Sequence, residues 1–408
     1  MRKDGIVSAA FTAWGDTHFT DTSLARVADR LGVTKQALYR HLSGKEELLR
    51  EMEHRFATDL ADVIEEFEQA ALSVDLADAV RRYVELLFRF FGEHPYYYLY
   101  LVLYLLRIPV RQGTTFLSVR TRHRKLLRAV LRNAGYAEGV ETEMGVHFLS
   151  VTGFFWMAGC FWTVDGHRRD EEADEAHITA RREIAVDLLL HGLFPPAASR
   201  PEFAAIEARD SIREAELPRR NRILSAIAEV VAADGFEQAT VERIAERAGM
   251  RKSSLYFHFR NRAEMMASLL VPERDRLIEL VNMRVSEYTE FASKLYAFMV
   301  TTATYAAQSR AILTALDWMR FHEIRIYLED TRKNGPVYDF LAEPLGRDGY
   351  SRAGLSRIEL AAYLHHLVIQ PVLDGRIGPV SGTQNDFDGL RLLYQLVIGG
   401  LMGKESRR

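Results

Sequence analysis

The sequence is poor in cysteine and has no long apolar run. Its 408 residues include one cysteine, Cys160, which excludes an intramolecular disulfide and a cysteine-rich metal site. The longest aromatic and aliphatic run, residues 96–106, is far shorter than the ~20 residues of a membrane-spanning helix. The first residues carry no apolar signal segment. We therefore expect a cytoplasmic protein with no membrane partner.

A strong charge of either sign is also lacking. The 53 basic and 56 acidic side chains leave a net charge of -3, which argues against a protein that coats polyanions non-specifically. No catalytic motif stands out, because Cys160 and the pairs His322-Glu323 and His365-His366 form no complete nucleophile or metal constellation. We expect no enzyme activity, no cofactor and no metal.

What the sequence does contain is an internal repeat. A shift of 217 residues places residues 6–49 over residues 223–266 without a gap, with 13 identities in 44 positions. Many of the differences keep the chemical type, as in Val27 and Ile244. The two copies should therefore share one fold.

Each copy predicts three short helices. The first is amphipathic, with apolar residues at i, i+3, i+4 and i+7. Hydroxyl residues then precede the second helix, and Gly32 or Gly249 ends it. A third helix follows at Thr34 or Arg251. A helix, a turn that contains glycine and a second helix form the helix-turn-helix pattern.

The third helix has an outward face that suits DNA. An α-helix fits the major groove, where polar side chains reach base edges while hydroxyl and cationic groups near them contact phosphates. Residues 1–50 carry a net charge of +2 and residues 219–263 a net charge of +4. The two copies of the repeat, which we call heads, are therefore basic, and the remainder of the chain is acidic. The DNA-binding set is Thr22, Ser23, Thr34, Lys35, Gln36, Ala37, Tyr39, Arg40, His41 and Lys45 in the first copy, and Thr240, Arg243, Arg251, Lys252, Ser253, Ser254, Tyr256, Phe257, His258 and Arg262 in the second.

Some members of the set have a plain structural alternative. His41 and His258 suit a phosphate contact or packing in the turn equally well. Arg30 and Arg247 lie late in the second helix, where a cation suits the helix dipole, so they are left out of the set. Lys35 and Lys252, which occupy the same outward position in both copies, are the stronger candidates for DNA contact.

These residues resemble the tetracycline-repressor (TetR) family of bacterial transcriptional regulators. The resemblance rests on residues 23–33, on the Leu-Tyr-x-His pattern at residues 38–41 and 255–258, and on residues 45–49 and 240–249. It implies that Tyr39, Lys45, Tyr256 and Arg262 contact the phosphate backbone while the residues just before them meet bases. It also implies a helical ligand-binding body after each head.

The resemblance and the repeat together predict an all-α chain with two TetR-like units. In the family, the last two helices of each subunit form a four-helix dimer interface, and residues 143–164, 188–194, 357–373 and 396–401 place all four in one chain. We expect an intramolecular pseudo-dimer that acts as a functional monomer. The expected domains are a head at 1–50, a body at 51–194, a linker at 195–218 with one helix over residues 202–217, a head at 219–266 and a body at 267–408.

Fusion frees the two heads to differ. Gln36 suits adenine and Arg251 suits guanine, whereas Phe257 can meet only a thymine methyl group or the backbone. We therefore expect an asymmetric operator with two unlike half-sites.

Aromatic residues in the bodies predict a pocket for an apolar or aromatic small-molecule effector, although more than half of them fit ordinary packing equally well. The ligand-binding candidates are Tyr97, Tyr100, Tyr104, Phe155, Trp156, Trp318, Phe321 and His322.

Three interpretations follow. The first is a ligand-responsive transcriptional repressor. The second is a binding module with this fold that has lost its effector response or one DNA head, which Phe257 would explain. The third, an enzyme on a helical scaffold, has no motif in its favour. The sequence does not distinguish a repressor from an activator.

Overall fold

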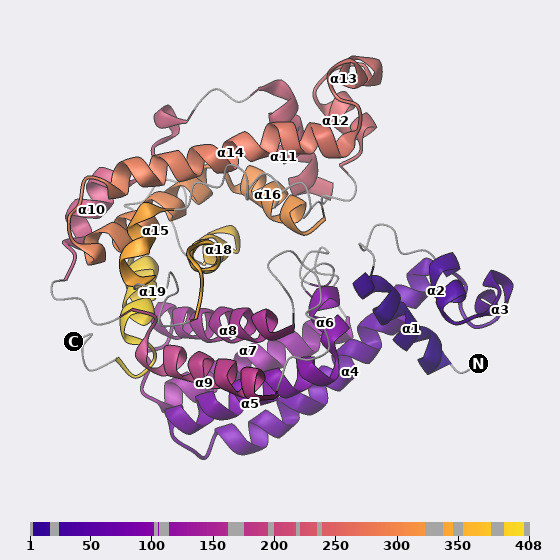
Figure 1. Cartoon of the computed structure of the whole chain (residues 1–408), viewed down its shortest axis with the longest axis horizontal. Helices are drawn as coiled ribbons and strands as arrows, with labels where there is room; N and C mark the ends of the chain where they lie inside the picture. The colour runs from indigo at the N-terminus through magenta and orange to yellow at the C-terminus, as the bar shows by residue number, and fades with distance from the viewer. Residues whose placement is uncertain are drawn as a thin grey trace. The chain divides into compact units, whose positions relative to one another are not determined.

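The computed structural model describes most of the chain. It covers residues 3–16, 24–101, 105, 114–161, 175–194, 200–217, 221–234, 239–322, 338–345, 354–376 and 387–403. Within these ranges the regular structure is helical, without a β-strand, which confirms the all-α class (Figure 1). No helix in the described ranges combines the length and apolar character needed to cross a bilayer.

The chain divides into two compact units. Unit 1 contains Met1–Ala134 and Arg169–Ile178, and unit 2 contains Gly135–Arg168 and Thr179–Arg408. The division runs through the range 51–194 that the repeat defines as the first body. The expected domain limits therefore describe the repeat in the sequence, and they stay a prediction.

Unit 1 holds the first head and most of the first body. The three head helices pack together, and the head continues without a break into the long helix α4, against which α5 and α7 lie. Short α6 packs against both α1 and α5. The helices of this unit are α1 (Lys3–Asp16), α2 (Leu24–Arg30), α3 (Lys35–Tyr39), α4 (Lys45–Ala71), α5 (Leu76–Glu93), α6 (Pro95–Tyr100) and α7 (Thr115–Asn133).

Unit 2 begins with α8 (Val140–Phe161) and with residues 179–191 of α9 (Glu175–His191), both from the first half of the sequence, and it contains the linker and the second half. Helix α15 is its centre, packed against α10, α14 and α18, and it is buried along almost its whole length. The remaining elements are α10 (Phe203–Asp210), the 3-10 helix η3 (Glu214–Glu216), α11 (Arg222–Asp234), α12 (Val241–Arg247), α13 (Lys252–His258), α14 (Arg262–Val285), α15 (Phe291–Gln308), α16 (Arg310–His322), the 3-10 helix η5 (Asp339–Leu345), α18 (Arg357–Leu373) and α19 (Asp388–Gly399).

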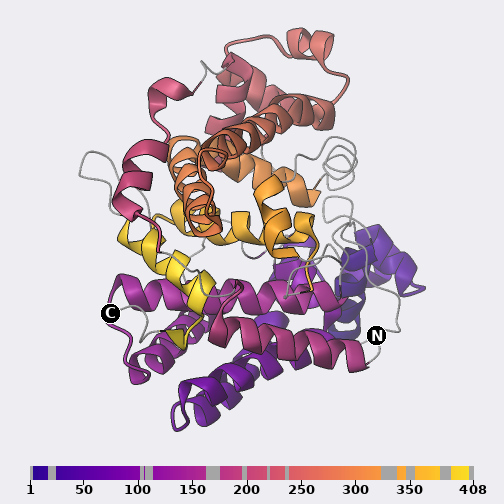
Figure 2. The same cartoon turned by 60° about the vertical axis from the view of Figure 1, so that its left-hand side comes forward.

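Within unit 2, α8 packs against α18 and α19 (Figures 1 and 2). Trp156 of α8 is fully buried, with its ring 5.0 Å from that of Tyr363 of α18 in an edge-on arrangement. The Tyr363 hydroxyl shares a 2.8 Å hydrogen bond with Thr152, and His147 Nε2 lies 2.8 Å from the carbonyl oxygen of Leu367. Helices from the two halves of the sequence therefore share one core, and α18 has the bounds expected for it.

The ends of α9 and α19 are joined reciprocally. Leu193 N–H donates to the Val397 carbonyl at 2.7 Å, and Leu401 N–H donates to the Leu189 carbonyl at 2.8 Å. These four residues correspond under a shift of 208, so the two bonds are images of each other, as in an isologous two-fold interface.

A glycine at each of these helix ends makes the close approach possible. Gly192 and Gly400 adopt φ values of 90° and 61°. A methyl group at Gly192 would overlap the backbone of Ile398, and one at Gly400 would overlap the backbone of Leu190. Only glycine satisfies both the positive φ and the contact.

The linker differs from the expectation. Instead of one helix over residues 202–217, α10 ends at Asp210, because the chain turns to extended backbone at Ser211. Ile212 N–H then donates to Thr304 Oγ1 of α15 at 2.9 Å, and a short 3-10 helix follows. The linker is therefore a packed part of unit 2.

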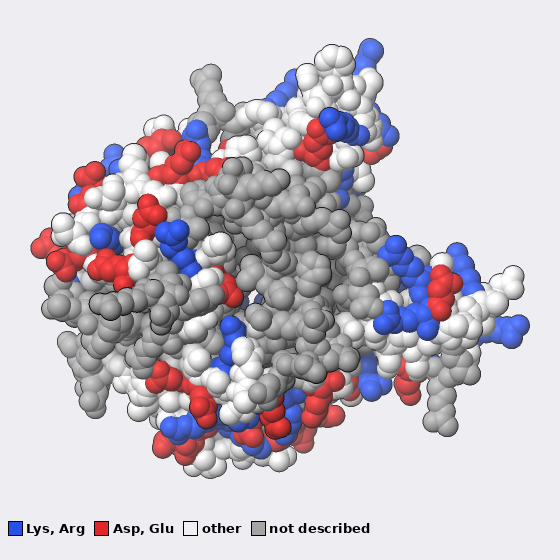
Figure 3. Space-filling view, viewed as in Figure 1, with Lys and Arg blue, Asp and Glu red and all other residues white. Residues whose placement is uncertain are grey.

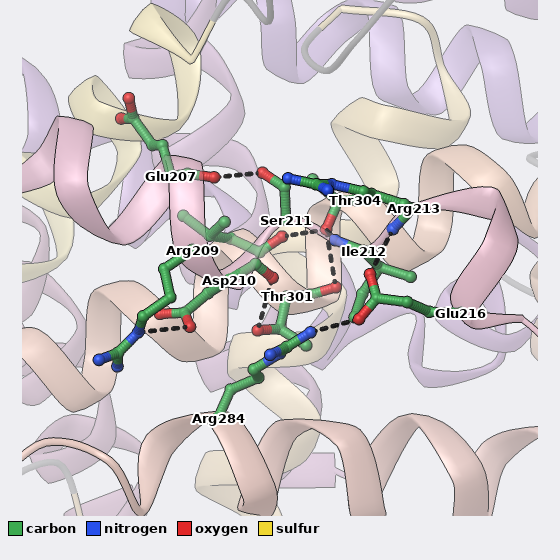
Figure 4. A network of polar contacts seen from close by, with 11 residues as sticks. Glu207, Arg209, Asp210, Ser211, Ile212, Arg213, Glu216, Arg284, Thr301 and Thr304 are labelled. Carbon is green, nitrogen blue, oxygen red and sulfur yellow. Dashed lines mark hydrogen bonds and ion pairs between the residues drawn. The ribbon is translucent and has the colours of Figure 1, made fainter.

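Two carboxylates hold this linker in place, and Figure 4 shows one of them, Asp210, with its partner Arg209. The Glu207 side chain is 8% exposed and receives two bonds from Arg391 of α19, at 2.7 and 2.5 Å, and one from the Tyr296 hydroxyl at 2.5 Å. Asp210 is fully buried and is bonded by Arg209 Nε and the Tyr288 hydroxyl.

Candidate nucleic-acid interface

The two heads have the same turn. Gly32 and Gly249 adopt φ values of 64° and 60°, and the next residue donates to the carbonyl five positions earlier, at 3.0 Å from Val33 to Ala28 and at 2.8 Å from Met250 to Ala245. This is the hydrogen bond of a helix that ends in a left-handed glycine. It turns the chain so that the third helix of each head begins directly after the second.

The first residue of that third helix is a lysine in both heads. Helix α3 begins at Lys35 and α13 at Lys252, one residue later than expected, because Thr34 and Arg251 are the N-cap residues. Thr34 Oγ1 accepts the Ala37 N–H at 3.2 Å, so its hydroxyl has a capping role. Thr240 caps α12 in the same way, as the sequence predicted, and accepts the Arg243 N–H at 3.3 Å.

The predicted DNA-binding residues for which the structure describes side chains lie on the surface, with three exceptions. Ala37, Ser254 and Arg262 are half-buried. Arg262 Nε donates to the Ala239 carbonyl at 2.9 Å, which ties this guanidinium to the segment before α12. Thr22 and Ser23 lie outside the described residues. The exposed members are Thr34, Lys35, Gln36, Tyr39, Arg40, His41, Lys45, Thr240, Arg243, Arg251, Lys252, Ser253, Tyr256, Phe257 and His258.

An aromatic ring stands out on each third helix. Phe257 is 86% exposed, and Tyr39 and Tyr256 are 47% and 48% exposed. The ammonium groups of Lys35 and Lys252 lie 5.8 and 5.5 Å from the ring centres of these two tyrosines. Both heads thus present a lysine above a tyrosine at the same positions, with lysine and arginine side chains exposed around them (Figure 3). Such a surface suits the phosphate backbone of DNA.

The loop after each third helix is fixed in the same way. Glu47 Oε2 accepts the Ser43 N–H at 2.6 Å, and Glu264 Oε2 accepts the Arg260 N–H at 2.7 Å. The Glu47 pKa is lowered, chiefly by this backbone hydrogen bond. The glutamate shared by both copies therefore fixes the loop after the third helix to the first turn of the long helix that follows.

The ligand-binding candidates fall into separate groups. Tyr97 and Tyr100 are buried beside Phe11 of α1 and Phe56 of α4, with ring centres 4.6 to 6.1 Å apart. The Tyr97 hydroxyl donates to Asp59 at 2.6 Å, and burial raises its pKa. These two tyrosines join the first head to its body and are packed as core.

Phe155 and Trp156 belong to unit 2, where both rings contact Tyr363 of α18. Tyr104 lies outside the described residues, as do the side chains of Trp318, Phe321 and His322. The effector site stays a prediction. Among the described residues, no group of three His, Cys, Asp or Glu side chains could hold a metal ion.

Sequence reasoning missed the contacts that cross between distant segments. Glu207 and Asp210 stand in a stretch of alternating charge, which is typical of a solvated helix, and nothing in it indicates that both carboxylates are buried. The pairing of Glu242 with Lys252 was also missed, although the repeat alignment offers a signal, since Ala25 stands at the position of Glu242.

Comparison with known proteins agrees with this geometry. The family model for bacterial regulatory proteins of the tetR family matches residues 6–52 and 223–269, which are the two heads. The HTH-type transcriptional regulator SrpR of Pseudomonas putida is 36% identical over 201 residues, which cover 49% of this chain and 83% of that protein.

Two further relatives match in part. The fatty acid metabolism regulator protein of Bacillus subtilis is 30% identical over 78 residues, and this chain spans only 40% of its length. The crystal structure of the TetR family transcriptional regulator PfmR from Thermus thermophilus has 25% sequence identity and a TM-score of 0.36, covering 46% of this chain and 96% of that chain. The doubled head and the long match to SrpR establish the conclusion: the chain belongs to the TetR family of bacterial transcriptional regulators, and it carries the family's DNA-binding head twice.

Proposed function

We propose that this protein is a ligand-responsive transcriptional repressor in which one chain acts as a pseudo-dimer on DNA. The observation that supports this most strongly is the reciprocal pair of backbone hydrogen bonds, Leu193 to Val397 and Leu401 to Leu189. An isologous contact of this kind joins two equivalent surfaces. Here both surfaces come from one chain, which leaves neither free to bind a second copy.

The operator in this proposal is asymmetric. The two third helices share a lysine and a tyrosine but differ at several other outward positions, where Arg40 corresponds to the exposed Phe257. Arginine reads guanine or phosphate, whereas phenylalanine can contact only apolar groups such as the thymine methyl. Two unlike half-sites follow from this difference. The helix-turn-helix geometry places them about one or more helical turns of DNA apart.

Selection of binding sites from a random duplex library tests the proposal. We expect the selected sites to contain two different half-sites, and we expect Arg40→Phe to change only one of them. Enrichment of a perfect palindrome as the strongest site would contradict the asymmetric operator. A library with no enriched sequence would contradict sequence-specific recognition.

The effector in this proposal is apolar or aromatic, and it acts from the body on the head. Tyr97 and Tyr100 support such a route, because they contact Phe11 of the head and Phe56 of the body at once. A relative is named for fatty acid metabolism, so a long-chain fatty acid and a planar aromatic dye are suitable probes. We expect one of them to raise the melting temperature and to release DNA. Binding without DNA release would contradict an effector role.

The alternative is a binding module in which the second head has lost its affinity for DNA, and the exposed Phe257 favours it. The variants Lys35→Ala and Lys252→Ala separate the two candidates. Weaker DNA binding by both variants supports the two-headed regulator, and an effect of Lys35→Ala alone supports the alternative.

A further inference from the structure

The recognition lysines of the two heads have different surroundings. Lys35 and Lys252 correspond under the 217-residue shift, begin α3 and α13, and lie above Tyr39 and Tyr256. The ammonium of Lys252 also forms an ion pair with Glu242 of α12. In the first head the corresponding position is Ala25, which has no carboxylate to offer.

The ion pair is placed where it competes with DNA. Glu242 lies in the first turn of α12, two residues after the N-cap Thr240. The side chains of Glu242 and Lys252 are 55% and 50% exposed, so both face solvent on the surface that carries the DNA-binding set. The carboxylate lowers the energy of the charged ammonium, and the pKa of Lys252 is accordingly raised while that of Glu242 is lowered.

Duplex DNA would have to replace this carboxylate. A lysine gains affinity for DNA by neutralising a phosphate and releasing its condensed counterion. If Lys252 moves to a phosphate, Glu242 loses its partner and stays beside a second negative charge. If Lys252 stays with Glu242, the second head has one phosphate contact fewer. In either case Lys252 contributes less to the DNA affinity of the second head than it would without the Glu242 carboxylate.

We propose that Glu242 sets the DNA affinity of the second head by holding Lys252 on the protein, so that Lys35 is the stronger of the two equivalent lysines. The proposal rests on the DNA-binding role of both heads. It makes Glu242 a positioning residue, which acts on DNA only through Lys252.

The test exchanges the two equivalent residues. Glu242→Ala gives the second head the first head's residue, and Ala25→Glu does the reverse. Binding to a labelled random-sequence duplex is measured over a range of salt concentrations. Because an exposed ion pair is worth up to about 1 kcal/mol, we expect Glu242→Ala to raise the affinity about fivefold at low salt. The slope of log affinity against log salt should steepen by about one phosphate contact, and Ala25→Glu should have the opposite effects.

A double-mutant cycle shows whether the effect passes through Lys252. We expect Lys252→Ala to cost less than Lys35→Ala in the wild-type protein, and to cost as much as Lys35→Ala when Glu242→Ala is present. Equal costs of Lys252→Ala with and without Glu242 would overturn the proposal.

Glu229→Thr is the matched control for charge. Glu229 pairs with Arg247 at the end of α12, its counterpart in the first head is Thr12, and its removal changes the net charge by the same unit. We expect a much smaller gain than for Glu242→Ala, because Arg247 is not on the third helix. A gain equal to that of Glu242→Ala would attribute the effect to net charge and overturn the proposal.

The outcomes also separate this proposal from the proposed function. A wild-type protein that binds no duplex at any salt concentration overturns both. A wild-type protein that binds DNA through Lys35, with an affinity unchanged by Glu242→Ala, overturns only the role of Glu242.

Discussion

The two heads share the glycine turn and the lysine–tyrosine pair of the third helix, and they differ in how each head is joined to its body. The first head is tied to its body by exposed ion pairs of Lys3 and by the rings around Phe11, whose counterpart in the second head is Ala228. In the second head, α11 packs against α16, and the linker that precedes the head is bonded to α14 and α15.

A duplicated regulator can therefore diverge more freely in the contact between head and body than in the turn before the third helix. The recognition geometry depends on short-range backbone bonds, which each copy must keep in order to form the turn. The connection between head and body depends only on a stable contact, which the rings around Phe11 provide in the first half and the packing of α11 against α16 provides in the second. A substitution can remove such a contact from one half and leave the other half unchanged. The loss of stability then shows how much that half depends on the contact.

The largest effect is expected where the halves meet. Gly400→Ala forces a methyl group against the backbone of Leu190 and His191 and adds strain at a positive φ. We expect the free energy of unfolding to fall by about 3 to 4 kcal/mol, measured by chemical denaturation. Gly139→Ala is the control, because Gly139 also has a positive φ but no heavy atom within 4 Å of the added methyl. Equal losses for the two variants would contradict the reciprocal contact.

A substitution among the rings that join the first head to its body should destabilise the protein nearly as much. Phe11 is 4% exposed and touches both Tyr97 and Tyr100. Phe11→Ala, which copies Ala228 of the second half, should cost about 3 kcal/mol in denaturant unfolding. Val7→Ala, on the same helix and also buried, should cost about 1 kcal/mol. A Phe11 variant as stable as wild type would show that these rings do not hold the head.

The linker of the second half comes next. Glu207→Ala removes the carboxylate that bonds both the Arg391 guanidinium and the Tyr296 hydroxyl, although Arg391 keeps its more exposed pair with Asp388. We expect a loss of about 2 to 3 kcal/mol in the same experiment. Glu68→Ala breaks the exposed pair with Arg122, whose side chains are 42% and 44% exposed, and should cost under about 1 kcal/mol. If the Glu207 variant loses no more free energy of unfolding than the Glu68 variant, the buried carboxylate does not stabilise the linker.

The smallest effect is a pH dependence of the first half. Burial lowers the pKa of His123, which stacks on Tyr83, to about 4. The unfolded chain therefore takes up this proton first as pH falls, and the free energy of unfolding decreases between the ordinary histidine pKa of about 6.5 and pH 4. Because His123 is only half-buried, we expect about 1 kcal/mol between pH 7 and 5. The measurement is the free energy of unfolding as a function of pH. We expect His123→Phe to remove this decrease between pH 7 and 5 and to leave the remainder of the profile unchanged.

Much of this architecture could be predicted from the sequence because it depends on local signals. Gly32 and Gly249 mark the turns, and Thr240 caps its helix as expected. The bounds of α18 follow from its apolar run and from the Ser356 cap that begins it. The repeat itself shows that both heads are present.

The contacts that join distant segments could not be predicted. Glu207 meets Arg391 across 184 positions, and a charged stretch does not show which of its carboxylates will be buried. Leu193 and Val397 meet through backbone atoms, which leave no trace in the side-chain pattern. The aromatic residues taken as ligand candidates face the same ambiguity, since a ring that packs a core and a ring that lines a pocket have the same spacing. Tyr100, with no exposed surface, is packed as core.

The central claim is that one chain supplies both halves of the two-fold unit. Light scattering coupled to size-exclusion chromatography tests it most directly, first on the free protein and then on its complex with a selected duplex. We predict a mass of 46.6 kDa for the free protein and one chain per duplex in the complex. A free protein of twice that mass at all concentrations, with two chains on each duplex, would contradict it.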